Sequence, residues 1–182
     1  HAAAGGRRAA ASLYGGGVAR LSGLDRKEQV AETYLTLAEG SLGRESPDPL
    51  RAMGFFDQAL ELGLPEERAR AVGLAAAQAS LQAADLRQIR PRDAVARFQA
   101  LAREGLPKDY QARVLLGLGA AQRRYGQGAA ARQALRDVLA LDPGEELAGD
   151  AAWEVALSYG VPTPVPALVD RAVDALRTLR QD

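Results

Sequence analysis

The sequence predicts an all-α protein built from antiparallel helix hairpins, and three observations lead to that prediction. Ala, Leu, Arg, Gln and Glu dominate the composition and favour helices, whereas the β-branched and aromatic clusters typical of strands are missing. Apolar residues recur at the three- and four-residue spacing of a buried helix face. Glycines and prolines divide the chain into segments with short connections, which place consecutive helices antiparallel to one another.

Recognisable signals mark the ends of these helices. Asp48 followed by Pro49 is typical of an N-cap with a proline in the first turn. Residues 63–65 and 105–107 both read Gly-Leu-Pro, which indicates a stop: the glycine takes a left-handed turn, the leucine folds back and the proline prevents continuation. We expect helices over residues 26–43, 49–62, 67–86, 92–104, 109–125, 128–141, 146–160 and 167–180.

The spacing of the apolar residues predicts the buried face of several helices. Each apolar stripe marks the side of a helix that we expect to face the core, and the last helix carries one over residues 168–176. The predicted stripes are Val30, Tyr34, Leu37, Ala38 and Ser41; Leu115, Leu118, Gly119 and Gln122; Leu135, Val138, Leu139 and Leu141; and Leu168, Ala172, Ala175 and Leu176.

The N-terminal segment, residues 1–25, is less well defined than the rest. Ala9 to Tyr14 and Val18 to Leu21 are expected to form a short or broken helix around three glycines. Residues 26–182 contain no low-complexity linker, although the proline-rich stretch 162–166 is a stiff break before the last helix. We therefore predict one helical repeat domain over residues 26–182.

The composition excludes several kinds of chemistry. Basic and acidic residues balance at 23 each, so no net field attracts nucleic acid or an anionic membrane. The chain has no cysteine, which rules out disulfides, thiolate catalysis and Cys-ligated zinc. Its only histidine is His1, so a Ser–His triad and a multi-histidine metal site are also excluded. No metal or cofactor is expected.

The remaining polar motifs have structural explanations. Glu66-Glu67 and Glu145-Glu146 fall at helix starts, where carboxylates complement the helix dipole. Residues 15–17 are glycines without the Lys-Ser/Thr and the preceding strand of a phosphate-binding loop. The arginines from Arg87 to Arg97 are interleaved with acidic residues and lack an aromatic platform, so nucleic-acid binding is not expected. The sequence predicts that the protein is not an enzyme.

Internal repeats are visible in the second helix of each of the first three hairpins. A small residue is followed four positions later by a bulky one, and a proline comes 13, 13 and 12 residues after the small residue. We align the preceding helices at Tyr34, Ala71, Leu115 and Trp153, which lie 37, 44 and 38 residues apart. The pairs in the second helices are Ala52 with Phe56, Ala94 with Phe98, and Ala131 with Leu135.

With these repeats the sequence resembles the tetratricopeptide repeat family. The segment 112–143 follows the family's 34-residue pattern without a gap, except that Gln122 replaces an aromatic. The resemblance covers roughly residues 30–160 and implies a right-handed α-solenoid of about three to four hairpins, in which Gly119 and Ala131 lie at the closest backbone approach. An irregular helical bundle is the alternative. The matching positions are Leu115, Leu118, Gly119, Ala131, Leu135 and Pro143.

The resemblance also implies a binding groove, because in this family the first helices of successive hairpins line a concave surface for a peptide or a partner helix. The corresponding face is acidic in the first repeat, small and apolar in the second, and basic in the third. Such a surface suits an amphipathic helix or an extended segment with a carboxylate. The predicted groove residues are Leu35, Glu39, Val72, Ala76, Ala79, Arg113, Leu116, Ala120, Arg123 and Arg124.

Two further points concern which segment could occupy this groove. Family members that bind chaperone tails use a carboxylate clamp with Lys and Asn on the first helices, and this chain has no Asn, so such a tail is disfavoured. A terminal helix of the chain itself, such as residues 167–180, is an alternative occupant of the groove.

We expect a non-catalytic adaptor or scaffold that binds another protein. The alternative is a sensor, regulatory or dimerisation module of a larger signalling or transcriptional protein. A second copy of the chain is also a candidate partner. No stretch is apolar enough to span a membrane, since even Ala71–Ala84 is interrupted by polar residues. The bias toward Ala and Arg is typical of a GC-rich bacterial genome, so we expect a soluble protein of the bacterial cytoplasm or cell envelope.

Overall fold

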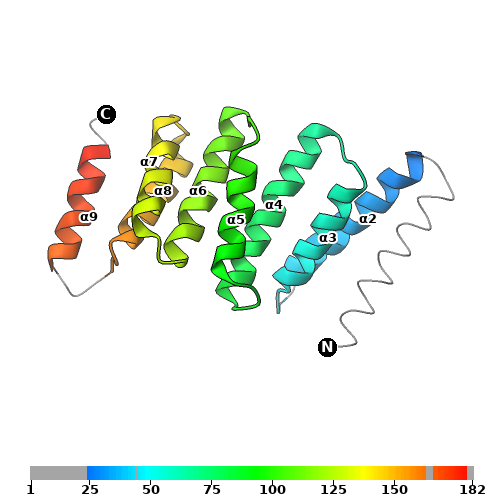
Figure 1. The fold of residues 1–182 in the computed structure, drawn as a ribbon, viewed down its shortest axis with the longest axis horizontal. Coiled ribbons are helices and arrows are strands. Elements are labelled where there is room, and N and C mark those ends of the chain that lie inside the picture. The colour runs from blue at the N-terminus through cyan, green and yellow to red at the C-terminus, as the bar shows by residue number, and fades with distance from the viewer. Residues whose placement is uncertain (1–23, 44, 163–165, 180–182) are drawn as a thin grey trace. The chain divides into compact units, whose positions relative to one another are not determined.

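A computed structural model describes residues 24–43, 45–162 and 166–179 of the chain. These residues form α-helices joined by turns, and no strand occurs among them (Figure 1). The expected helix around residues 9–21 lies outside the described residues. The helices are α2 (Leu24–Leu42), α3 (Pro49–Glu61), α4 (Glu66–Asp85), α5 (Pro91–Ala102), α6 (Lys108–Arg124), α7 (Gly128–Ala140), α8 (Glu145–Ser158) and α9 (Pro166–Leu179).

The all-α prediction is confirmed, and each predicted helix start lies within two residues of the observed one. Asp48 caps α3 as expected, because its carboxylate accepts a hydrogen bond from the backbone N–H of Arg51 at 3.1 Å and Pro49 opens the helix. The acidic pairs that we predicted at helix starts occupy the first turns of α4 and α8.

The two Gly-Leu-Pro segments end their helices differently. Gly63 has a φ of 81°, so it takes the left-handed turn predicted for it, and Leu64 folds back onto the apolar core. Gly105 does not take a positive φ, and α5 already ends at Ala102, three residues before it. The prediction of one shared stop geometry is therefore wrong for the second copy.

The helices repeat along the chain with a regular period. The first helices of the hairpins begin at Leu24, Glu66, Lys108 and Glu145, which are 42, 42 and 37 residues apart. The pattern of buried side chains follows the same period, since Tyr34, Ala76, Leu118 and Val155 are separated by the same intervals and are all at most 8% exposed. The second helices begin at Pro49, Pro91, Gly128 and Pro166.

This period corrects the alignment that the sequence suggested for the first helices. Leu37, which we placed in a packing stripe, is 42% exposed. Trp153, at which we aligned the fourth opening, is 57% exposed, and Ala71, at which we aligned the second, is exposed as well. The predicted openings were spaced 37, 44 and 38 residues apart instead of 42, 42 and 37. Each residue of offset turns the predicted face by about 100° around the helix, which is enough to exchange buried and exposed positions.

The second-helix alignment is confirmed. The three alanines of the predicted pairs, Ala52, Ala94 and Ala131, are fully buried, and the bulky partners Phe56, Phe98 and Leu135 are at most 4% exposed. Small residues at the helix crossings let backbones approach, and the bulky residue one turn later fills the core.

The chain divides into two compact units, with the boundary between Ala79 and Ser80 inside α4. In the N-terminal unit, α2 and α3 pack as an antiparallel pair, and the ring of Tyr34 stacks on Phe55 with centroids 6.1 Å apart. Burial, together with the charge of Glu61, raises the pKa of the Tyr34 hydroxyl. The core of this unit consists of Tyr34, Leu35, Ala38, Ala52, Phe56, Ala59, Val72, Ala76 and Ala79.

In the C-terminal unit, α6 packs between α5 and α7, and two glycines make this possible. A Cβ atom on Gly117 would overlap the buried ring of Phe98 from α5. A Cβ atom on Gly119 would lie 2.7 Å from Cγ of Leu135 and 3.3 Å from the carbonyl oxygen of Ala131, both in α7. The close approach predicted for Gly119 and Ala131 is confirmed.

The last helix, α9, packs against α8 in the C-terminal unit. Ala172 is 2% exposed, and Ala175 and Leu176 pack against a core that contains Val138 and Val155. The apolar stripe predicted for this helix therefore faces the unit's own core at these positions.

The glycine contacts predict opposite effects of the same substitution at different positions. Gly117→Ala or Gly119→Ala should lower the free energy of unfolding by about 1–3 kcal/mol, because the new methyl group overlaps a fully buried side chain. Gly149→Ala in α8 is the matched control and should raise it by about 0.5–1 kcal/mol, since nothing lies within 4 Å of its Cβ position. Urea unfolding followed by circular dichroism measures all three, and equal effects would contradict the packing described.

Candidate functional site

The predicted groove residues of the N-terminal unit are mostly covered by that unit's own core. Leu35 and Val72 are 7% and 6% exposed, and Ala76 and Ala79 are 1% exposed each. All four belong to the cluster that packs around Phe56, whereas Glu39 is exposed. The structure therefore brings these residues together as a core and does not display them on an open face. That a partner binds there stays a prediction.

The predicted groove residues of α6 differ in how far they reach the surface. Arg113 is exposed, and it makes no ion pair within the described part of the chain. Leu116 is half-buried and packs against the core of the C-terminal unit. Ala120 is 6% exposed and offers little surface to a partner.

Arg123 and Arg124, at the end of α6, are engaged by acidic residues of the same unit. The Nε atom of Arg123 donates a hydrogen bond of 2.7 Å to Oε2 of Glu154 in α8. The Nε atom of Arg124 donates one of 2.6 Å to Oδ1 of Asp85 at the end of α4, and its Nη1 lies 3.8 Å from Oε1 of Glu154. The two guanidinium groups and two carboxylates form one network.

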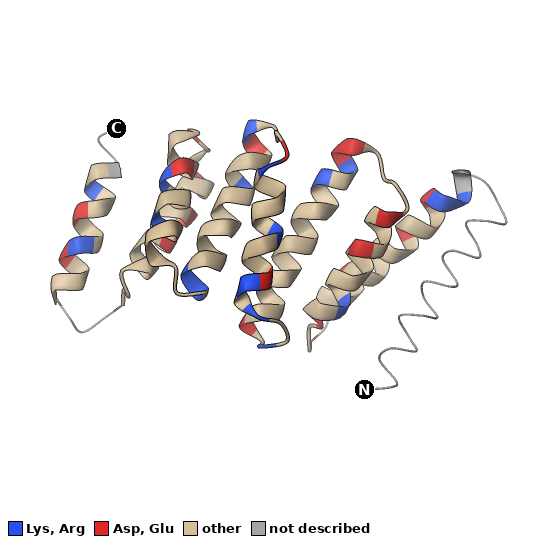
Figure 2. Cartoon of the chain, viewed as in Figure 1, with Lys and Arg blue, Asp and Glu red and all other residues tan. Residues whose placement is uncertain are grey.

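Because of this network, the arginines at the predicted basic end of the groove are less available to a partner's carboxylate. The Arg123 and Glu154 side chains are only 24% and 15% exposed, so their charges are largely neutralised within the unit. A partner's carboxylate would have to displace Glu154 or Asp85 to be held by both arginines. Figure 2 shows that basic and acidic residues are interspersed over the helices, with neither sign confined to one of them.

An exposed tryptophan, Trp153, lies beside a member of this network in the sequence. It is the only tryptophan of the chain and is 57% exposed, the highest fraction among the large apolar side chains of the described residues. The opposite side of α8 is buried, since Ala151 and Val155 are 0% and 2% exposed. Trp153 directly precedes Glu154, whose carboxylate binds Arg123.

Trp153 and Leu116 occupy equivalent positions in successive first helices. They are 37 residues apart, as are the starts of α6 and α8 and the buried residues Leu118 and Val155. We therefore define the α6–α8 face as Arg113, Leu116 and Trp153, with the Arg123–Glu154 ion pair at its edge.

The sequence interpretation missed Trp153 as a member of this face, and it missed Glu154 and Asp85 as the partners of Arg123 and Arg124. The repeat alignment matches Trp153 with Leu115 because it begins an apparent Trp-x-x-Ala-Leu repeat opening. When α8 is aligned with α6 on their buried residues, the opening begins one residue earlier. Val155 and Ala156 are then the buried pair of α8. The 37-residue interval between the starts of α6 and α8 aligns Trp153 with Leu116 instead of Leu115.

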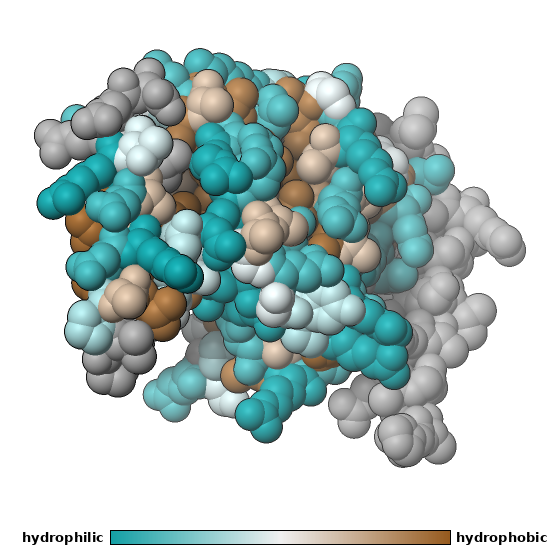
Figure 3. Space-filling view, turned by 60° about the vertical axis from the view of Figure 1, so that its left-hand side comes forward, coloured by the Kyte–Doolittle hydropathy of each residue, from teal (hydrophilic) through white to brown (hydrophobic). Residues whose placement is uncertain are grey.

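Other kinds of site receive no support from the described residues. Within these ranges, no three carboxylate or other metal-ligating side chains gather at one place. None of the described helices has the length and apolar character needed to cross a membrane. The side of the molecule that comes forward in Figure 3 is mostly hydrophilic, with small apolar patches between polar side chains.

Comparisons with known proteins give no match: no family model, no curated protein and no solved structure is significantly similar to the chain.

The ion-pair network predicts a measurable coupling between α6 and α8. In a double-mutant cycle, Arg123→Ala and Glu154→Ala should couple by about 1–2 kcal/mol of unfolding free energy, because the pair is largely shielded from water.

The matched control is the Arg68–Glu32 pair, which links α4 and α2 and is 49% exposed on both sides. Its coupling energy should be below about 0.5 kcal/mol, since exposed ion pairs add little to the free energy of unfolding. Equal coupling energies for the two pairs would contradict a structural role of Glu154.

Proposed function

We propose that the protein is a non-catalytic interaction module that binds another protein through the α6–α8 face. The observation that supports this proposal most is the exposure of Trp153 on a helix whose other side is buried. A large aromatic ring in water is unfavourable, and tryptophan is enriched among the residues that dominate binding energy at protein interfaces. Leu116 supplies a further apolar side chain, and Arg113 supplies a cation that no acidic side chain of the described residues pairs with.

We further propose that the hairpins are of the tetratricopeptide type and stack as a right-handed solenoid. The repeated period of the helix starts and of the buried positions supports this proposal. In the corrected alignment, Val155-Ala156 takes the place of Leu118-Gly119, and Tyr159 follows at the position where the family has its aromatic residue. First helices of such hairpins line the binding surface, and α6 and α8 are first helices.

The partner segment that this face favours is apolar with an acidic group nearby. An amphipathic helix could place an apolar residue on Trp153 and Leu116 and a carboxylate on Arg113. Arg123 and Arg124 are less suited to that role because Glu154 and Asp85 already hold them. Of the three arginines predicted for the groove, Arg113 at the beginning of α6 is therefore the one best suited to an acidic contact.

The experiment that tests the proposal compares two exposed apolar residues. The full chain, Trp153→Ala and Leu37→Ala are each used to capture partners from the native organism, with quantitative mass spectrometry as the readout. Leu37, 42% exposed in α2, is the matched control because its truncation also removes exposed apolar surface. Trp153→Ala should reduce capture of a specific partner at least tenfold, the loss expected for a residue that contributes about 2 kcal/mol or more.

Two outcomes would overturn the proposal. Partner capture that survives Trp153→Ala, or falls equally with Leu37→Ala, would exclude a specific role of the α6–α8 face. If the captured protein is the chain itself, sedimentation of the wild type should show a dimer that Trp153→Ala dissociates, and the module would then serve self-association.

A further inference from the structure

A small pocket lies on the other side of α8, between α7 and α9. Its volume is about 230 Å³, below the range of about 300–1,000 Å³ typical of sites for drug-sized ligands, so it suits a group of side-chain size. Val155 and Tyr159 follow Trp153 by two and six positions, which turns them to the opposite side of the helix. The pocket is lined by Arg132, Arg136, Val155, Tyr159, Ala175 and Thr178.

The two arginines of the pocket differ from those of the ion-pair network because no carboxylate of the described residues binds them. The guanidinium of Arg132 stacks over the ring of Tyr159, 4.6 Å from its centroid, and donates one long hydrogen bond of 3.4 Å to the carbonyl oxygen of Ser158. Arg136 donates a hydrogen bond of 2.7 Å to the neutral side chain of Gln133. Both arginines therefore keep donors that the described residues leave unused.

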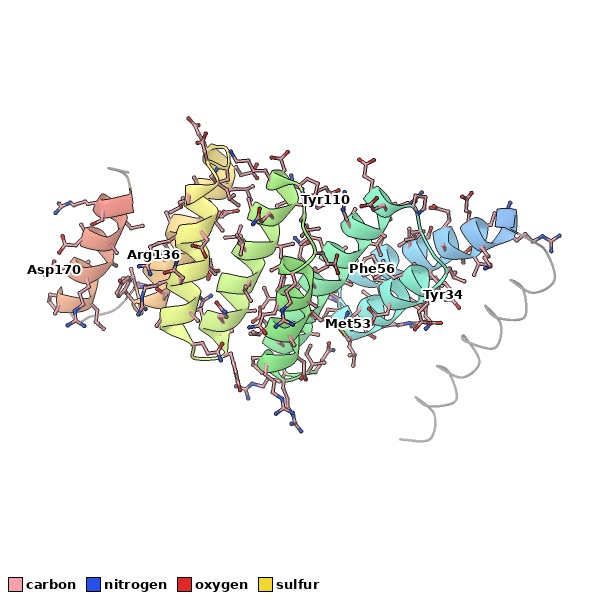
Figure 4. All side chains as sticks on the ribbon, turned by 45° about the horizontal axis from the view of Figure 1, so that its top comes forward. Tyr34, Met53, Phe56, Tyr110, Arg136 and Asp170 are labelled. Carbon is pink, nitrogen blue, oxygen red and sulfur yellow. The ribbon has the colours of Figure 1, made fainter. Side chains whose placement is uncertain are left out.

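The acidic residues near the pocket are engaged elsewhere or point away. Asp137 accepts a hydrogen bond from Gln133, and Asp174 pairs with Arg177. Asp170, labelled in Figure 4 with Arg136, lies on the side of α9 turned away from α7 and does not line the pocket. The pocket thus combines two cations with apolar walls from Val155 and Ala175, and none of the described residues that line it is acidic.

We propose that this pocket binds a carboxylate carried on a short apolar group. Two guanidinium groups that line the same pocket can hold both oxygens of a carboxylate, and stacking on Tyr159 fixes the plane of the Arg132 group. The apolar walls favour a carboxylate with a small aliphatic part over inorganic phosphate, which has none. A peptide C-terminus and a short-chain organic acid both carry this chemistry. The site is separate from the α6–α8 face and does not depend on the function proposed for it.

The test is a calorimetric titration of the full chain with four probes. N-acetyl-Ala-Val with a free C-terminus should bind, and the same peptide with a C-terminal amide should not. Isobutyrate distinguishes the two sources: binding as tight as that of the peptide acid would assign the pocket to free organic acids, and weaker binding to a peptide terminus. Inorganic phosphate is the fourth probe and should bind more weakly than either acid.

Arg136→Gln should weaken binding of the best carboxylate about tenfold or more, because it removes a charge-assisted hydrogen bond while Arg136 is exposed and not needed for folding. Arg103→Gln, directly after α5, makes the same charge change at an exposed position outside the pocket and should leave affinity unchanged. Circular dichroism confirms that both variants are folded. The proposal is overturned if no carboxylate binds at millimolar concentration, if amide or phosphate binds equally well, or if both variants behave alike.

Discussion

The repeat period of the helices is the constraint on which the rest of the structure depends. A single helical hairpin cannot bury its apolar face alone, and the buried positions of the first helices recur at the same intervals as the helix starts. In the C-terminal unit this requires α6 to approach both α5 and α7, which Gly117 and Gly119 permit because they carry no side chain. Once these contacts set the rotation of each helix, the positions left outside the core are determined as well.

The exposed face of the C-terminal unit follows from that rotation. Trp153 reaches solvent because Val155 and Ala156 take the inner positions of α8. Glu154 comes to lie beside Arg123 for the same reason, and this pair joins α6 to α8. On the other side of α8, Tyr159 and Val155 line a pocket with residues of α7 and α9, and no described carboxylate binds its two arginines. Two chemically different surfaces therefore arise from one helix.

Much of the fold could be predicted from the sequence because local signals determine it. Asp48-Pro49 marks a helix start through a capping hydrogen bond and a fixed φ, and both act within a few residues. The alanine and phenylalanine pairs of the second helices were also recognised, since their spacing equals that of the Gly-Leu-Pro segments that follow them. These features need no knowledge of how distant segments meet.

The site could be predicted less well because it depends on the register between helices. The first helices are rich in alanine, so Ala71, Ala75 and Ala76 fit a packing stripe equally well in more than one rotation. Only tertiary contacts decide that Ala76 is buried and Ala71 is exposed. The partners of Arg123 and Arg124 come from α8 and α4, 31 and 39 residues away in sequence, and no local pattern identifies such pairs.

The most direct measurement of the central claim uses the intrinsic fluorescence of Trp153, since the chain contains no other tryptophan. The account predicts an emission spectrum close to that of tryptophan in water and efficient quenching by iodide in the isolated protein. A blue-shifted emission that iodide does not quench would show that the ring is covered, and an open α6–α8 face would then be contradicted.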